Sequence, residues 1–147
     1  MQLTSIQPRQ NIIAIDNWQE YLRDGEQFLH TARRAHELGK KAFSPETLYN
    51  LTAMAIEKYI MAFLMHRGDL ADNHTMNDLA DALERHTGPL PELAPQLRQL
   101  DALQDICDAY QSSYAMIDSR QIEEIIAIGH QVQRTIQTLL EQEPASQ

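Results

Sequence analysis

Apolar residues recur every three or four positions along most of this 147-residue chain, which is the spacing of amphipathic helices. Five helices are predicted from this pattern. The first begins near Asn17, where Asp16 and Gln19 fit a capping box. We expect it to end near Lys40 or Lys41. Its apolar face comprises Trp18, Leu22, Gly25, Leu29 and Ala32.

The second helix has a strong start signal in residues 44–46, which read Ser-Pro-Glu: a serine cap, a proline at the first position and an acid in the first turn. Gly68 ends it, and its apolar face comprises Leu48, Leu51, Ala55, Tyr59, Ala62 and Phe63. A third, shorter helix begins near Asn73, and the Thr-Gly-Pro segment at residues 87–89 ends it. Its apolar face comprises Met76, Leu79, Ala80 and Leu83.

Pro95 is expected to open the fourth helix, whose apolar positions are Leu97, Leu100, Leu103, Cys107, Tyr110 and Tyr114. A second capping box, Asp118 with Gln121, precedes the fifth helix. That helix carries Ile122, Ile125, Ile126, Gly129, Val132, Ile136 and Leu139. No strand-like alternation of useful length is present. We therefore predict an all-α, up-and-down bundle of four or five helices. Residues 1–15 form an irregular N-terminal arm, residues 16–141 a single domain, and residues 142–147 a frayed tail.

The charge balance argues against binding to a long polyanion. The formal net charge is −9, whereas proteins that bind nucleic acid through its phosphates usually carry a basic surface. The local basic concentration comprises Arg33, Arg34, Lys40 and Lys41, late in the first helix, where cations also complement the helix dipole. A small recessed basic site is compatible with this charge balance.

Cysteine content and apolar runs indicate the compartment. Cys107 is the single cysteine, so the chain forms no internal disulfide. The N-terminus lacks the charged start and apolar core of a signal peptide, and the longest apolar run, residues 59–65, is too short to span a bilayer. We expect a cytoplasmic protein with no membrane association.

Metal and cofactor chemistry is disfavoured by the spacing of the acidic residues. Di-iron bundles need Glu-x-x-His pairs on facing helices, and the chain contains none. Asp-x-x-Asp pairs do occur, at residues 69 and 72, 78 and 81, and 105 and 108, but such pairs are common on exposed faces of acidic helices. We predict no metal site, no cofactor and no catalytic residue.

The middle of the chain resembles the HEPN domain family of helical bundles. The matching parts are Ala-Ile-Glu-Lys at residues 55–58, Ala-Phe-Leu at residues 62–64, then Gly68, and then His74 followed by Leu79. The resemblance covers about residues 17–140 and extends to Trp18 in the first helix and to Tyr114 and Arg120 before the last one.

Two departures from the family pattern bear on function. The third helix of the family usually carries His-Asp-Leu, whereas here four residues separate His74 from Leu79. Active members also carry an arginine followed, after four to six residues, by a histidine in the C-terminal half. The chain has that spacing between Arg23 and His30 and between Arg67 and His74, but neither pair lies in that region.

The resemblance implies a dimeric, non-catalytic binding module. Such a module would act with nucleotides or RNA, or with a separate nucleotidyltransferase-type protein, within a toxin–antitoxin or defence module. Its ligand-binding candidates are Lys58, Arg67, His74 and Arg120. His74 precedes a predicted helix, whose free N–H groups favour anions, although a loop-anchoring role explains it equally well. Two alternatives stay open: a metal-independent ribonuclease with an atypical Arg/His pair, and a structural adaptor that binds another protein.

Overall fold

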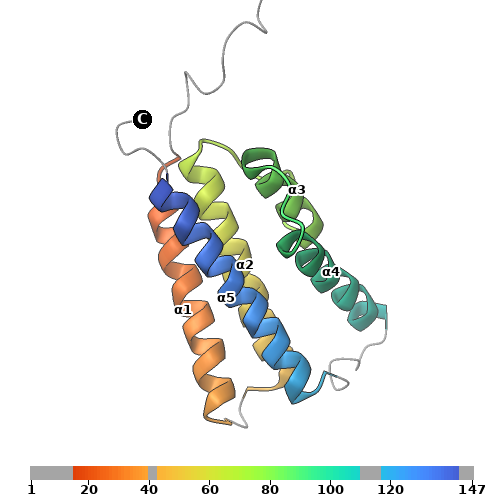
Figure 1. Ribbon diagram of the computed structural model, residues 1–147. Coiled ribbons are helices and arrows are strands. Elements are labelled where there is room, and N and C mark those ends of the chain that lie inside the picture. Colours follow the sequence, from red (N-terminus) through yellow and green to blue (C-terminus); the bar gives the residue numbers. More distant parts are fainter. Residues whose placement is uncertain (1–14, 40–42, 110–116, 143–147) are drawn as a thin grey trace, which may run out of the picture.

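The computed structural model describes residues 15–39, 43–109 and 117–142 of the chain. These residues contain five helices and no strand (Figure 1). The helices are α1 (Trp18–Glu37), α2 (Pro45–His66), α3 (Met76–Thr87), α4 (Leu93–Ala109) and α5 (Ser119–Gln142). The all-α prediction is confirmed. Two predicted features lie outside the residues that the structure describes. They are most of the N-terminal arm (residues 1–14) and the positions of Tyr110 and Tyr114 in the predicted fourth helix.

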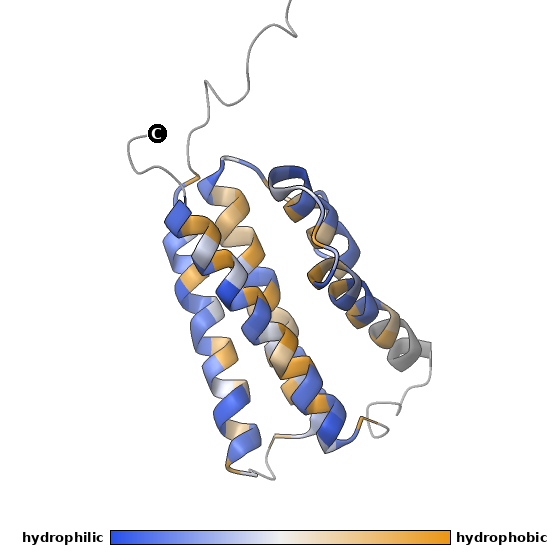
Figure 2. Cartoon of the chain, viewed as in Figure 1, coloured by the Kyte–Doolittle hydropathy of each residue, from blue (hydrophilic) through white to orange (hydrophobic). Residues whose placement is uncertain are grey.

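Helix α2 is the central helix of the bundle. Its residues 59–65 are all buried, and Figure 2 shows it as the most apolar helix, whereas α1 and α5 carry alternating apolar and polar faces. The fully buried large side chains are Tyr59, Phe63, Leu29, Ile56, Ile60, Leu64, Leu79, Leu83, Leu97, Ile122, Ile136 and Val132. The long apolar run in the sequence is therefore explained by burial against neighbouring helices. Among the described helices, none combines the length and the apolarity that crossing a membrane would require.

Two glycines let α1 and α5 approach α2 closely. A Cβ atom added at Gly25 would lie 3.2 Å from the ring of Tyr59. One added at Gly129 would lie 2.9 Å from a methyl group of Leu29 and 3.1 Å from that of Thr52. Both glycines were predicted to lie on the apolar faces of their helices, and both are buried. Their small size fixes the distance at which α1 and α5 meet.

Helices α3 and α4 form an antiparallel pair held by polar contacts. The carboxylate of Asp101 on α4 accepts the backbone N–H groups of Met76 and Asn77, at 2.9 and 2.7 Å. These groups lie at the N-terminus of α3, where N–H groups lack partners within the helix. Arg98 donates to Asp81 at 2.7 Å, which ties the two helices together a turn further on.

The chain doubles back after α2, so that α3 runs in the same direction as α2. His74, just before α3, contacts Glu57 in the middle of α2. Asp69, just after α2, accepts a hydrogen bond from His86 near the end of α3, at 2.7 Å. Helix α5 also runs parallel to α2 (Figure 1). Because α2, α3 and α5 share one direction, a simple up-and-down order is not confirmed.

Two of the predicted helix starts are confirmed in detail. The hydroxyl of Ser44 accepts the N–H of Thr47 at 3.1 Å, with Pro45 at the first helical position. At the start of α5, the N–H of Gln121 donates to the Asp118 carboxylate at 2.9 Å. The N–H of Asp118 in turn donates to the side-chain oxygen of Gln121 at 3.0 Å. This reciprocal pair is a capping box.

The start of the first helix near Asn17 is confirmed, but the predicted capping box and the predicted C-terminal end are wrong. The residue that caps α1 is Asn17, which adopts a left-handed conformation with φ of 79° and makes no side-chain cap bond. The expected capping box of Asp16 and Gln19 therefore does not form. The helix ends at Glu37, before the predicted Lys40 or Lys41, because the chain turns out of the helix at Gly39, where φ is 62°.

The starts of α3 and α4 also differ from the prediction. Helix α3 begins at Met76, three residues after the expected Asn73, because the Thr75 hydroxyl accepts the N–H of Asp78 and caps the helix there. Helix α4 begins at Leu93, two residues before Pro95.

Candidate functional site

The four residues predicted to bind a ligand do not come together. Arg120 lies at the start of α5 with 87% of its side chain exposed, and it pairs with Glu124 at 3.6 Å. His130 lies ten residues further along the same helix, about 15 Å away along its axis. Arg120 and His130 therefore cannot act on one ligand group within one chain. Arg67 lies at the opposite end of the bundle, as the C-cap of α2.

Lys58 joins α2 to α1. Its ammonium group lies 3.9 Å from the carboxylate of Asp24 and 4.1 Å from the centre of the Tyr21 ring. An ammonium above an aromatic ring is attracted by the ring's negative face. His74, in the loop before α3, contacts Glu57 and so ties that loop to α2. Both candidates thus make contacts within the bundle.

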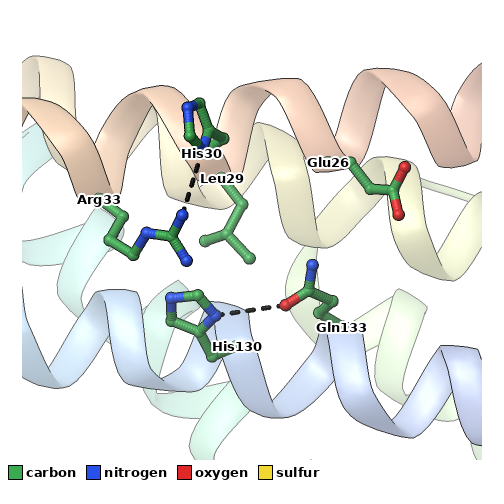
Figure 3. Close-up of a pocket in the computed structure, with 6 residues that line it drawn as sticks. All are labelled: Glu26, Leu29, His30, Arg33, His130 and Gln133. Atoms are coloured by element: carbon green, nitrogen blue, oxygen red, sulfur yellow. Dashed lines mark hydrogen bonds between the residues drawn. The ribbon is translucent and has the colours of Figure 1, made fainter.

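A pocket between α1 and α5 brings together a different set of polar side chains (Figure 3). Its volume is about 230 Å³ and its lining residues are Glu26, Leu29, His30, Arg33, His130 and Gln133. Glu26, Leu29, His30 and Arg33 lie on α1, and His130 and Gln133 lie on α5. Figure 3 shows the Arg33 guanidinium and the His130 ring facing the same gap, with Leu29 beside them. The candidate site is therefore this α1–α5 pocket.

On the α1 side of the pocket, Arg33 contacts His30 one turn earlier on the same helix. A terminal nitrogen of Arg33 donates to Nδ1 of His30 at 3.1 Å. A guanidinium group has donors and no acceptor, so Arg33 can only donate in this contact. Arg33 supplies a permanent positive charge to the pocket.

On the α5 side, Gln133 connects the pocket to the core. Its side-chain N–H donates to the hydroxyl oxygen of Tyr59 at 2.9 Å, and its side-chain oxygen lies 3.3 Å from Nδ1 of His130. Burial raises the pKa of Tyr59 to about 12; the bond from Gln133 acts against this rise, and the charge of Glu26 adds to it. Tyr59 is therefore a neutral anchor for the Gln133 amide.

This arrangement suits a small ligand that has both an anionic group and hydrogen-bonding groups. A guanidinium binds two oxygens of a phosphate or carboxylate in a fixed fork geometry. The histidine rings offer a proton acceptor and donors, and Leu29 supplies an apolar wall. Across the part of the chain that the structure describes, no group of three or more possible metal ligands comes together.

The sequence signal for this pocket was weak. Two pairs share a helix face at a spacing of three residues, His30 with Arg33 and His130 with Gln133. The sequence distinguishes His30 only by its spacing from Arg23, and Arg23 is exposed and does not line the pocket. The sequence does not predict that α1 and α5 pack together at the positions of these two pairs.

Comparison of the chain with protein-family models, with curated proteins and with solved structures finds no match in any of the three. The resemblance to the HEPN family therefore rests on the residues quoted for it.

Proposed function

We propose that this protein is a non-catalytic binding module that takes a small phosphate-bearing ligand, such as a mononucleotide, in the α1–α5 pocket. The observation that carries the proposal is the facing of Arg33 and His130, from helices far apart in the sequence, into one pocket (Figure 3). Convergent polar groups in a concave site are the usual mark of a ligand site.

Size and charge select the ligand class. The pocket, about 230 Å³, lies below the roughly 300 Å³ at which drug-sized sites begin, so it holds a phosphate with part of a sugar. Arg33 supplies the charge for the phosphate, and Glu26 and Gln133 can bind sugar hydroxyls. The net charge of −9 repels a long polyanion, which favours a small ligand over extended RNA.

A thermal-shift series tests the proposal. Inorganic phosphate, ribose 5-phosphate and AMP are each titrated into the wild type, R33Q and R34Q. Arg34 is the matched control, since it is the next residue on α1, is exposed and does not line the pocket. We expect a rise in Tm with ligand concentration that persists in R34Q and is lost in R33Q. Equal shifts in both variants, or no shift for any of the three ligands, would contradict it.

A second candidate function is metal-independent cleavage of RNA. It requires an arginine guanidinium and a histidine imidazole to meet in one cleft, and Arg33 and His130 support it because they line the same pocket. The arginine would bind the phosphate, and the histidine would take the proton of the ribose 2′-hydroxyl as its oxygen attacks the phosphorus. The bond from phosphorus to the 5′-oxygen of the next nucleotide would break, and that oxygen would take a proton from water. Incubation of the wild type, R33Q and H130Q with a labelled RNA, followed on a gel, tests it. If the wild type cleaves the RNA and both variants do not, the protein is an enzyme and the proposal of a non-catalytic binding module is wrong.

The assembly state and the partner are separate parts of the proposal. The resemblance to the HEPN family supports a homodimer and a separate nucleotidyltransferase-type partner, as in a toxin–antitoxin pair. An adaptor role would use exposed apolar side chains, and Leu38, Met54 and Leu70 are exposed. Light scattering on the purified protein tests the dimer: a monomer mass at micromolar concentration would remove it from the proposal.

A further inference from the structure

We infer that the α1–α5 pocket prefers a phosphate monoester that also carries an ammonium group, such as an amino sugar phosphate, over the same ester without that group. The residue that makes this distinction is Glu26, at the end of the pocket opposite Arg33. The inference rests on the proposed function, because it names a second recognition group for a ligand that Arg33 holds by its phosphate.

The pocket has a positive end and a negative end. Glu26 and Arg33 both line it, and both lie on α1. Seven residues make almost two turns of a helix, so the two side chains leave the same face, about 10 Å apart along the axis. Figure 3 shows Arg33 with His130 at one end of the gap and Glu26 at the other, with Leu29 between them. A ligand that lies along this gap therefore meets a cation at one end and a carboxylate at the other.

Neither of these two charges is paired with an opposite charge among the residues that the structure describes. Helical side chains form ion pairs at spacings of three or four residues, so Glu26 and Arg33 are too far apart to pair with each other. The guanidinium of Arg33 donates to the ring of His30, at 3.1 Å, and to no carboxylate of the described helices. By contrast, the carboxylate of Asp24, two residues before Glu26, lies 3.9 Å from the ammonium of Lys58. Glu26 is therefore available to a cationic group of a ligand.

The charge of Glu26 also acts on the inner wall of the pocket. Burial raises the pKa of Tyr59 to about 12, and the negative charge of Glu26 adds to this rise. The Tyr59 hydroxyl is hydrogen-bonded at 2.9 Å to Gln133, which lines the pocket together with Glu26. The field of the Glu26 carboxylate therefore reaches the interior side of the pocket as well as the solvent.

The other polar groups of the pocket do not favour an ammonium over a hydroxyl. A side-chain oxygen of Gln133, or a lone pair on His30 or His130, accepts a hydrogen bond from either group. Arg33 repels an ammonium at close range. A carboxylate binds an ammonium more strongly than a hydroxyl, because both partners of the hydrogen bond are then charged. Preference for the ammonium therefore depends on Glu26, which is exposed and accessible to a ligand that extends from the pocket.

Calorimetric titration with glucosamine 6-phosphate and with glucose 6-phosphate at pH 7 tests the inference. The two probes differ only in the amino group that replaces one hydroxyl, and at this pH the amine is mainly protonated. We expect glucosamine 6-phosphate to bind about fourfold more tightly at low ionic strength, the effect of one solvent-exposed ion pair. In concentrated salt the ratio should fall towards one, because salt screens an exposed pair.

Three variants of α1 assign the preference to Glu26. E26Q keeps the size of the side chain and removes its charge, so the ratio of the two affinities should fall to about one. In E26K the ratio should invert, because a positive charge then faces the ammonium. E20Q is the matched control: Glu20 is an exposed acid of the same helix that does not line the pocket, so this variant loses the same charge and should keep the wild-type ratio. A ratio that falls equally in E26Q and E20Q would overturn the inference, because the net charge and not Glu26 would then attract the ammonium.

The outcomes separate this inference from the proposed function. Equal affinity of the wild type for the two sugar phosphates would overturn the inference, and binding that is lost in R33Q would at the same time leave the proposed function intact. A preference for glucosamine 6-phosphate that E26Q leaves unchanged would also overturn the inference. Failure of both probes to bind would overturn the proposed function, and the inference with it.

Discussion

The side-chain amide of Gln133 on α5 donates to the hydroxyl oxygen of Tyr59 on α2, at 2.9 Å, and this bond joins the α1–α5 pocket to the centre of the bundle. Tyr59 is completely shielded from solvent. The Gln133 amide is therefore held by a residue of the core.

The stability of the protein should depend on Tyr59 in alkaline solution. Burial raises the pKa of Tyr59 from 10.0 to about 12, so between these values the unfolded chain has lost this proton and the folded chain retains it. The contribution of the protonated Tyr59 hydroxyl to the free energy of unfolding is therefore complete below pH 10 and is lost as the pH rises towards 12. Relative to Y59F, the wild type should lose about 1 kcal/mol of unfolding free energy between pH 9 and pH 11. Urea unfolding of both proteins measures this, and a constant difference would contradict it.

Gly129→Ala should destabilise the protein. The added methyl group would lie 2.9 Å from Leu29 and 3.1 Å from Thr52, so α5 must move away from α1 and α2. Overpacking of this kind costs about 1–3 kcal/mol, of which the better helix propensity of alanine returns at most about 1 kcal/mol. Chemical unfolding measures the loss.

Two further alanine variants serve as controls for Gly129. Gly25→Ala should cost less, because its nearest neighbours would lie at 3.2 to 3.3 Å. Gln137→Ala, at an exposed position of α5, should be close to neutral. A Gly129→Ala protein as stable as the Gln137→Ala protein would show that α1 and α5 do not meet as described.

Asp69 should stabilise the folded protein near neutral pH, and this stabilisation should be lost in acid. Burial alone would raise the pKa of Asp69, but hydrogen bonds from His86, from the N–H of Leu70 and from Arg85 outweigh it and hold the pKa below 3.8. For a carboxyl group with a lowered pKa, the stabilisation is present above its unfolded value and is lost as the pH falls through the folded one. The wild type should therefore be more stable than D69N at pH 5.5, and the difference should shrink towards pH 3.

Denaturant midpoints of the wild type and D69N at the two pH values check this prediction. D72N is a suitable control, because Asp72 is an exposed residue of the same loop. A difference between wild type and D69N that grows in acid would have the wrong sign.

The helix starts show which parts of the fold could be predicted from sequence. The caps at Ser44 and Asp118 depend on side chains within three residues of the helix start, so local sequence was sufficient. The expected cap at Asp16 does not form because Asn17 adopts a left-handed conformation. The residues around Asn17 give no signal that predicts this conformation. The direction of α3 was also missed, since it depends on a contact of His74 with Glu57, seventeen residues earlier.

The site was harder to predict than the fold. His30 and His130 lie one hundred residues apart, and their helices cross at a register that Gly129 and Leu29 determine by close contact. Residue spacing describes one helix at a time and carries no information on this register. Local sequence instead favours Lys58, Arg67 and Arg120, which the fold distributes over separate parts of the bundle.

A titration of the isotopically labelled protein with inorganic phosphate, followed by backbone amide NMR, tests the central claim most directly. If the α1–α5 pocket binds phosphate, the saturable shift changes should be largest for His30, Arg33, His130 and Gln133 and should disappear in R33Q. Shift changes centred instead on Lys58, His74 or Arg120, or none at millimolar phosphate, would contradict the account.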